Sequence, residues 1–303
     1  MKTATFVIPT FRETDKIRSL MECFRHIADK AIEIIIVNGY PGDETSAWLK
    51  ENKAFPVIEL EGNPSLYWSG LVNVGLRYLQ ETSDKPRYFF LMNADVKFST
   101  DILQLFLRQI AMEVPCQVAA MTVANGIVLS SGVKVVSWLL TINRHVLAGR
   151  HIDSIEKGQL IPVNFLPTRC VMFPYEALEK GGLANETKLP HYGSDYEFTF
   201  RLVRLGYPAY VSTDVVVELD VQHTGADVYY KKMGIWRRCV SLFSIKSPSN
   251  PVFQMRFIRL TYPRYARPTA YVLYLARAIL EIIVGGAILK RYLPMKECGF
   301  SGR

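Results

Sequence analysis

The first hundred residues alternate short β-rich runs with segments of helical hydrophobic spacing, and this alternation limits the chain to few folds. The β-rich runs cover residues 5–8, 33–37, 57–60 and 88–91. Apolar residues recur at helical spacing from Ile17 to Ile27 and again from Leu71 to Leu79. The order strand, helix, strand predicts a parallel sheet with helices on both faces. We therefore expect an α/β fold with at least four such units before residue 115.

Beyond this region, the β-like runs between residues 118 and 136 are shorter and are interrupted by turn sequences. Asn125-Gly126 is a hairpin signal, and Ser130-Ser131-Gly132 marks a second break. These turns predict antiparallel strands, so the expected sheet is mostly parallel but mixed.

Ligands of such sheets bind outside the carboxyl ends of the strands, so the residues that follow each strand are the first candidates for a site. The first run is followed by Pro9-Thr10-Phe11-Arg12-Glu13. This segment holds neither the Gly-x-Gly-x-x-Gly fingerprint nor a Walker loop. A dinucleotide-dependent oxidoreductase and a P-loop kinase are thereby disfavoured.

The run at residues 88–91 leads into Met92-Asn93-Ala94-Asp95. This order places an amide and a carboxylate at the carboxyl edge of the sheet. Mg²⁺ or Mn²⁺ can bind there, because such ions take one or two protein carboxylates and complete their shell with phosphates and water. The structural alternative is that Asp95 caps a helix beginning near Thr100.

A second acidic pair lies in Gly193-Ser194-Asp195-Tyr196-Glu197 at the start of a predicted helix. Residues i and i+2 do not share a helix face, so the two acids can have different tasks. Asp195 is a candidate general base, and its structural alternative is a helix cap. His223 is a candidate third metal ligand, although a lone histidine after a strand is more often structural.

Taken in order, these segments resemble the family 2 glycosyltransferases of the GT-A fold. The resemblance covers about residues 1–225 and is nearest to the bacterial rhamnosyltransferase-like branch that builds surface polysaccharides, in which Asn-x-Asp stands where other members have Asp-x-Asp. It is carried by Phe6-Val7-Ile8-Pro9-Thr10-Phe11, Glu33 to Val37, Asn93-Ala94-Asp95, Gly193 to Glu197, Arg201 and Gly206. The implied fold is Rossmann-like, with a mostly parallel mixed sheet and flanking helices.

The resemblance also implies roles for individual residues. Asp95 becomes the metal ligand and Asp195 the catalytic base, with Glu197 as second choice because Ser194 replaces the Glu that precedes the base in the family. Asn38 stands where the family has an Asp beside the nucleotide base. The residues implied in donor binding are Pro9, Thr10, Arg12, Glu13, Asn38, Trp68, Gly70, Asn73 and Asn93.

The activity implied is inverting transfer of a sugar from a nucleoside diphosphate sugar, either dTDP-rhamnose-like or a UDP-sugar. The acceptor is a hydroxyl of a lipid-linked or glycan molecule. A divalent ion stabilises the leaving diphosphate and one carboxylate takes the acceptor proton. Two alternatives remain open: a sugar nucleotidyltransferase, whose glycine-rich phosphate loop is absent here, and a catalytically inactive nucleotide-sugar-binding scaffold.

Charge is divided unevenly along the chain. Residues 226–303 hold 14 Lys/Arg against 3 Asp/Glu, whereas residues 1–225 hold 22 against 25. We expect a catalytic domain over residues 1–225 and a basic, aromatic and apolar helical extension over residues 226–303. Aromatic residues alternate with the cations there, which favours an anionic membrane surface as partner. Nucleic acid is disfavoured, since no binding motif accompanies the charge.

Residues 270–289 are mostly apolar but are interrupted by Arg277, Glu281 and a Gly-Gly pair. A charge near the centre of a bilayer costs roughly 2.5–3.5 kcal/mol, so an interfacial helix or a helix packed in a homo-oligomer is favoured over a span. The five cysteines form no Cys-x-x-Cys pair, and the apolar run at the N-terminus is too short for a signal peptide. We expect a cytoplasmic protein, peripheral at the inner face of the cytoplasmic membrane.

Overall fold

The computed structural model describes residues 2–52, 56–110, 114–219 and 234–284. Its strands are β1 (Ala4–Thr10), β2 (Ile32–Asn38), β3 (Val57–Glu61), β4 (Tyr88–Met92), β5 (Val96–Lys97), β6 (Gln117–Ala124), β7 (Ile127–Ser130), β8 (Val133–Ser137), β9 (Ile142–His145), β10 (Leu160–Val163), β11 (Cys170–Pro174) and β12 (Ala209–Leu219). Its helices are α1 (Thr14–Phe24), α2 (Glu44–Glu51), α3 (Tyr67–Glu81), α4 (Ile102–Gln109), α5 (Tyr175–Gly181), α6 (Ser194–Arg204), α8 (Ile235–Leu242), α9 (Pro251–Thr261) and α10 (Arg267–Val284), with 3-10 turns η1 (Ile152–Ser154) and η3 (Arg264–Ala266).

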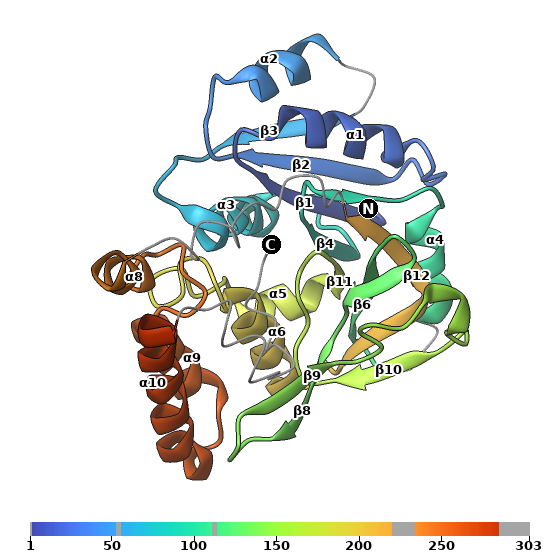
Figure 1. The fold of residues 1–303 in the computed structure, drawn as a ribbon. Coiled ribbons are helices and arrows are strands. Elements are labelled where there is room, and N and C mark those ends of the chain that lie inside the picture. Colours follow the sequence, from blue (N-terminus) through green and yellow to red (C-terminus); the bar gives the residue numbers. More distant parts are fainter. Residues whose placement is uncertain (1, 53–55, 111–113, 220–233, 285–303) are drawn as a thin grey trace.

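A central sheet runs through the molecule in the order β10-β12-β6-β11-β4-β1-β2-β3, with β5 beside β12 and β7 beside β6 (Figure 1). Strands β1, β2, β3 and β4 are mutually parallel, as the alternation in the sequence predicts. Strand β11 is antiparallel to both of its neighbours, β4 and β6. The sheet is therefore mostly parallel but mixed, as the sequence predicts.

The strands at the centre of the sheet are buried on both faces, which explains their continuous apolar runs. One face packs against α3, α5 and α6, and the other against α1 and α4. Alternate residues of β1 divide between the two layers, so that Val7 lies in the first and Phe6 and Ile8 lie in the second. The close approach of α3 depends on Gly75, because a Cβ there would lie 2.4 Å from Cγ1 of Val7.

The first predicted turn joins antiparallel strands, whereas the second separates β7 from β8, which belong to different sheets. Asn125 and Gly126 have φ of 49° and 73° and join β6 to β7. Positive φ at both residues matches the right-handed twist of the paired strands, as expected of this dipeptide. The strands β8 and β9 form a separate two-stranded sheet after the second turn.

The C-terminal helices α8, α9 and α10 form a group of their own at one side of the sheet (Figure 1). Residues Phe257, Ile258 and Ala270 from this group share a third buried cluster with Phe165 and Tyr196. Arg277 and Glu281 of α10 form the i,i+4 pair expected from their spacing, at 3.4 Å. Among the described helices, none has both the length and the hydropathy that crossing a bilayer requires.

Candidate active site

Asn93 and Asp95 lie directly after β4, at the carboxyl edge of the parallel part of the sheet. Antiparallel pairing places Cys170 of β11 opposite Met92, so the preceding Arg169 lies opposite Asn93. The Asn93 N–H donates to the Arg169 carbonyl oxygen at 3.0 Å, and an Arg169 guanidinium nitrogen lies 3.8 Å from Asp95 Oδ2. The pairing of β4 with β11 therefore brings a fixed cation beside the candidate metal ligand.

Asp95 does not cap the following helix. The N-cap of α4 is Asp101, whose carboxylate accepts a hydrogen bond from the Gln104 N–H. Asp95 Oδ1 is buried and has no hydrogen-bond partner among the described residues. A buried carboxylate oxygen without a donor is costly unless a ligand or cation satisfies it, so Asp95 fits a divalent ion.

The described residues contain no group of three or more His, Cys, Asp or Glu that could enclose a metal ion by themselves. A site built on one carboxylate leaves most of the coordination shell to other oxygens. That arrangement suits Mg²⁺ or Mn²⁺ held jointly by a protein and a diphosphate. His223, the predicted third ligand, lies outside the described residues.

Asp195 lies in the first turn of α6, after Gly193, whose φ of 78° lets the chain turn sharply into the helix. Burial raises the pKa of Asp195 from 3.8 to about 6, while hydrogen bonds from the Tyr196 and Thr168 N–H groups and the Arg169 charge oppose that rise. The N-cap of α6 is Gly193 rather than Asp195. Arg169 thus acts on both candidate carboxylates, since it also pairs with Asp95.

Glu197 occupies different surroundings, as its position two residues after Asp195 predicts. Its buried carboxylate accepts hydrogen bonds from Arg201 at 3.0 and 3.3 Å. Arg201 also donates to the carbonyl oxygens of Gly181 and Leu183, so the pair joins α6 to the end of α5. These contacts describe a structural ion pair and favour Asp195 over Glu197 as the reactive acid.

The start of α3 binds the segment that leads to α6. Ser69 donates through its hydroxyl to the Leu189 carbonyl oxygen at 2.6 Å. The Asn73 side chain donates to the Ala184 carbonyl and accepts from the Ala184 N–H, at 2.9 and 2.8 Å. A Cβ at Gly70 would lie 2.8 Å from the Cβ of Leu66, so the helix start is closely packed. Asn73 and Gly70 therefore shape the site, and their predicted contact with the donor stays a prediction.

Trp68 points its indole toward the candidate metal ligands, since Nε1 donates to Asn93 Oδ1 at 3.3 Å. His191 lies near the same helix start, with its ring 6.0 Å from that of Tyr67 and 4.5 Å from that of Tyr192. Burial, followed by the charge of Lys246, lowers the pKa of His191 to about 4. The imidazole is therefore neutral at pH 7.

The predicted donor residues after β1 lie beside the turn after β2, because Gly39 N–H donates to the Thr10 carbonyl oxygen at 2.8 Å. The guanidinium of Arg12 stacks 3.8 Å from the centroid of the Tyr40 ring. Glu13 pairs with Lys16 one turn into α1. Pro9 and Thr10 are buried, and the Thr10 hydroxyl has no partner among the described residues. An exposed cation on an aromatic ring is a surface that suits a nucleobase or phosphate.

Asn38 is fully buried at the end of β2. Its amide nitrogen lies 3.0 Å from both Asp43 Oδ1 and Ser46 Oγ and 3.1 Å from Glu59 Oε1, and its oxygen accepts from the Tyr40 N–H at 3.0 Å. These contacts hold the turn that carries Tyr40. The predicted contact of Asn38 with the nucleotide base stays a prediction.

Sequence reasoning missed Arg169 and Tyr40. Arg169 precedes a short strand whose antiparallel partner, β4, is distant in the chain, and no local sequence pattern predicts that pairing. Tyr40 stands in a turn sequence, Asn38-Gly39-Tyr40-Pro41-Gly42, where an aromatic residue has no spacing signal of its own.

Comparison with known proteins shows which proteins the chain resembles. Residues 5–127 match the family described as Glycosyl transferase family 2. Among solved structures, the fold is similar to a mannosyltransferase from Pyrobaculum calidifontis in complex with GDP-Man and Mn²⁺, with 16% identity, a TM-score of 0.54, and 98% of this chain and 83% of that chain covered. It is also similar to TarS from S. aureus in complex with UDP, with 15% identity, a TM-score of 0.54, and 97% and 76% covered.

GalNAc-T7 with UDP, GalNAc and Mn²⁺ has a TM-score of 0.60 at 10% identity, and the match covers 97% of this chain and 58% of that chain. No match is found among curated proteins. At these identities the structural likeness establishes the fold. Together with the sequence match, it confirms the resemblance to family 2 glycosyltransferases of the GT-A fold.

The two acids of α6 should affect stability with opposite signs. The native pKa of Asp195, about 6, lies above the ordinary 3.8, so stability falls as pH rises between these values. Ionised Asp195 then costs at most about 3 kcal/mol at pH 7. Asp195→Asn should raise the free energy of unfolding at pH 7, measured by urea denaturation, and change it less at pH 4.

Glu197→Gln should lower the free energy of unfolding by about 1–3 kcal/mol, because Arg201 loses its charged partner. Changes of the same sign would contradict the surroundings described for the two acids.

Proposed function

We propose that this protein is an inverting glycosyltransferase that moves a sugar from a nucleoside diphosphate sugar to a hydroxyl of a lipid-linked or glycan acceptor in bacterial surface polysaccharide synthesis. The single observation that carries the proposal is that Arg169 influences two carboxylates of different character, through a contact with Asp95 and through its charge on Asp195. Asp95 has a buried oxygen without a partner, and Asp195 has a pKa of about 6. One fits a metal ligand and the other fits a general base.

The diphosphate of the donor would lie at the edge formed by Asn93 and Asp95. Asp95 would hold the divalent ion, and Asn93 is placed beside it by its contacts with Trp68 and Arg169. A divalent ion bound there supplies Lewis-acid stabilisation of the charge that develops on the leaving diphosphate. The complexes of the Pyrobaculum mannosyltransferase and of GalNAc-T7 with Mn²⁺ support this assignment by analogy.

Asp195 would accept the proton of the attacking acceptor hydroxyl. As the hydroxyl oxygen forms its bond to the anomeric carbon, the bond from that carbon to the diphosphate oxygen breaks, and the proton passes to the Asp195 carboxylate. The attack comes from the face opposite the leaving group, so configuration inverts. A pKa of about 6 leaves Asp195 ionised at pH 7 yet basic enough to take a proton.

The nucleoside would lie over the edge of β1 and β2. The buried Thr10 hydroxyl and the stacked pair of Arg12 and Tyr40 offer a polar group, a cation and an aromatic edge there. The complexes of similar structures with GDP-Man and UDP show that this fold accepts different bases. A screen of UDP-, dTDP- and GDP-sugars for binding and turnover would identify the donor, and turnover would exclude an inactive scaffold.

A membrane surface would be contacted by α8, which presents apolar side chains and cations to solvent. Trp236 and Val240 are 78% and 60% exposed. Arg237 lies between them in sequence and is also exposed. A helix with this composition suits adsorption to an anionic interface, which would keep the protein peripheral at the cytoplasmic face of the membrane.

Substitution of the two central carboxylates should separate chemistry from donor binding. Asp195→Asn should reduce transfer by about 10²-fold or more while leaving donor affinity within a few-fold, because it removes the base alone. Asp95→Ala should weaken Mg²⁺- or Mn²⁺-dependent donor binding as well as turnover. Calorimetric titration with the donor, with and without metal, together with initial rates, measures both effects. Near-normal turnover of Asp195→Asn would reject Asp195 as the base.

The rate should depend on pH through Asp195. Since the carboxylate must be deprotonated to act as base, kcat/KM should fall as pH drops through about 6. Arg169→Gln removes a charge that lowers the pKa of Asp195, so the acidic limb should move to higher pH. Arg169→Lys keeps the charge and should leave the limb near its original position. Identical limbs in all three proteins would show that another group controls the profile.

Liposome binding tests the role of α8. Trp236→Ser combined with Val240→Ser should reduce sedimentation with anionic liposomes several-fold, because it removes exposed apolar area that would enter the interface. Val114→Ser combined with Leu205→Ser is the matched control, since these residues are also exposed but belong to other parts of the surface. Substitution is preferred to deletion because α9 and α10 contribute to the third buried cluster. Equal binding of both variants and the unchanged protein would contradict the docking role of α8.

A further inference from the structure

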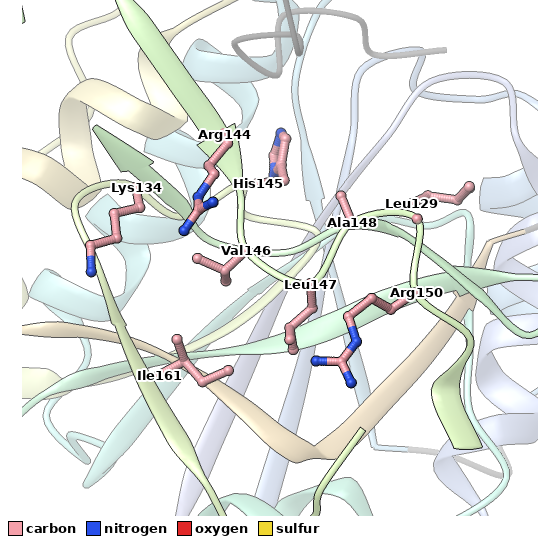
Figure 2. Close-up of a pocket in the computed structure, with 10 residues that line it drawn as sticks. Leu129, Lys134, Arg144, His145, Val146, Leu147, Ala148, Arg150 and Ile161 are labelled. Carbon is pink, nitrogen blue, oxygen red and sulfur yellow. The ribbon is translucent and has the colours of Figure 1, made fainter. Parts of the chain in front are cut away.

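A cavity of about 670 Å³ lies on the side of the molecule formed by the β8–β9 hairpin, β7 and β10. Its lining consists of Leu129, Lys134, Arg144, His145, Val146, Leu147, Ala148, Gly149, Arg150 and Ile161 (Figure 2). Neither Asp95 nor Asp195 is among these residues. The cavity is therefore distinct from the site already described.

Two of the three cations in this cavity are held directly opposite each other. Lys134 of β8 and Arg144 of β9 are cross-strand partners in the antiparallel register. Like charges in such a pair destabilise the sheet. No acidic residue lines the cavity, and none is paired with Lys134 or Arg144 in the described parts of the chain. An anion bound between them would remove the repulsion.

The third cation, Arg150, lies on the opposite side of the cavity from the other two, and apolar residues between them form the floor of the cavity. Figure 2 shows Lys134 and Arg144 on one side of Val146, Leu147 and Ile161, and Arg150 on the other. The turn before Arg150 is in an unusual conformation, since Leu147 has φ of 63° although it is not glycine. Such a backbone conformation is unfavourable for a residue other than glycine and is retained where the surrounding structure requires it.

Strand β9 lies between the cavity and the first turn of α6. His145 follows Arg144 and points away from the apolar floor in Figure 2. Its Nδ1 lies 2.7 Å from the Ser131 carbonyl oxygen, and its Nε2 lies 3.5 Å from the hydroxyl of Tyr196, the neighbour of Asp195. A molecule held in the cavity is thus separated from the first turn of α6 by one strand.

We infer that this cavity binds a phosphate group carried by the acceptor. The inference deepens the proposed transferase function and rests on it. Arg and Lys donors arranged around a common space are suited to phosphate oxygens, and the apolar floor suits the body that carries the phosphate. The phosphate can belong to a lipid headgroup or to a phosphodiester in a glycan chain.

Direct titration with phosphate probes tests the inference. The probes are a short glycerol-phosphate oligomer for the glycan source and short-chain phosphatidic acid below its critical micelle concentration for the lipid source. Lys134→Gln combined with Arg144→Gln should weaken binding of the preferred probe at least about tenfold. Lys30→Gln combined with Arg108→Gln removes the same charge at exposed positions elsewhere and should leave the affinity within about twofold. The probe that binds more tightly identifies the source.

The outcomes separate the cavity from the transferase proposal. The cavity variant should keep its melting temperature, since it removes like-charge repulsion, and should bind the nucleotide sugar as the unchanged protein does. Absence of probe binding, equal binding by the cavity variant, or equal loss in the control variant would overturn the cavity as a phosphate site. Failure of the unchanged protein to bind any UDP-, dTDP- or GDP-sugar would instead overturn the proposed function.

Discussion

The antiparallel pairing of β11 with β4 is the constraint on which the candidate site depends. A wholly parallel sheet would carry the chain away from its carboxyl edge through a helix after each strand. Because β11 runs the other way, its first residues start at that edge, and Arg169 enters the site from the backbone opposite Asn93. Arg169 directly precedes this central strand, and its backbone bond to Asn93 places its side chain 3.8 Å from Asp95.

Asp195 and Glu197 are separated by one residue in the sequence, but their carboxylates lie in different surroundings. Glu197 is buried against a guanidinium that binds it through two nitrogens, and this pairing compensates for its loss of water. For Asp195, the backbone hydrogen bonds and the Arg169 charge that favour its ionised form do not offset its burial, and its pKa rises as a result. The two acids of this helix turn therefore differ in their surroundings, and Gly193 provides the backbone geometry that starts the turn.

Much of the fold followed from local pattern. The continuous apolar runs of β1 and β2 and the helical spacing after them predicted the parallel sheet, and Asn125-Gly126 predicted the β6–β7 hairpin. Asp95 was predicted as a site residue because it follows a strand, and Asp195 because it begins a helix. The role of Arg169 could not be predicted in this way, since the pairing of β4 with β11, two segments distant in the sequence, brings it next to Asp95. The cavity at β8–β9 was missed for a similar reason, because Lys134 and Arg144 become neighbours only through the hairpin register.

The third buried cluster bears on the distance between the exposed face of α8 and the first turn of α6. It joins Val133 of β8, Tyr196 of α6 and Phe257 of α9 in one packed unit, and Arg238 of α8 donates to the carbonyl oxygen of Ile282 in α10 at 3.3 Å. The exposed apolar face of α8 and the first turn of α6 are therefore parts of one stiff body. If α8 lies on a bilayer, the height of Asp195 above that bilayer is set by the fold, and only acceptors whose reactive hydroxyl stands at that height can be modified.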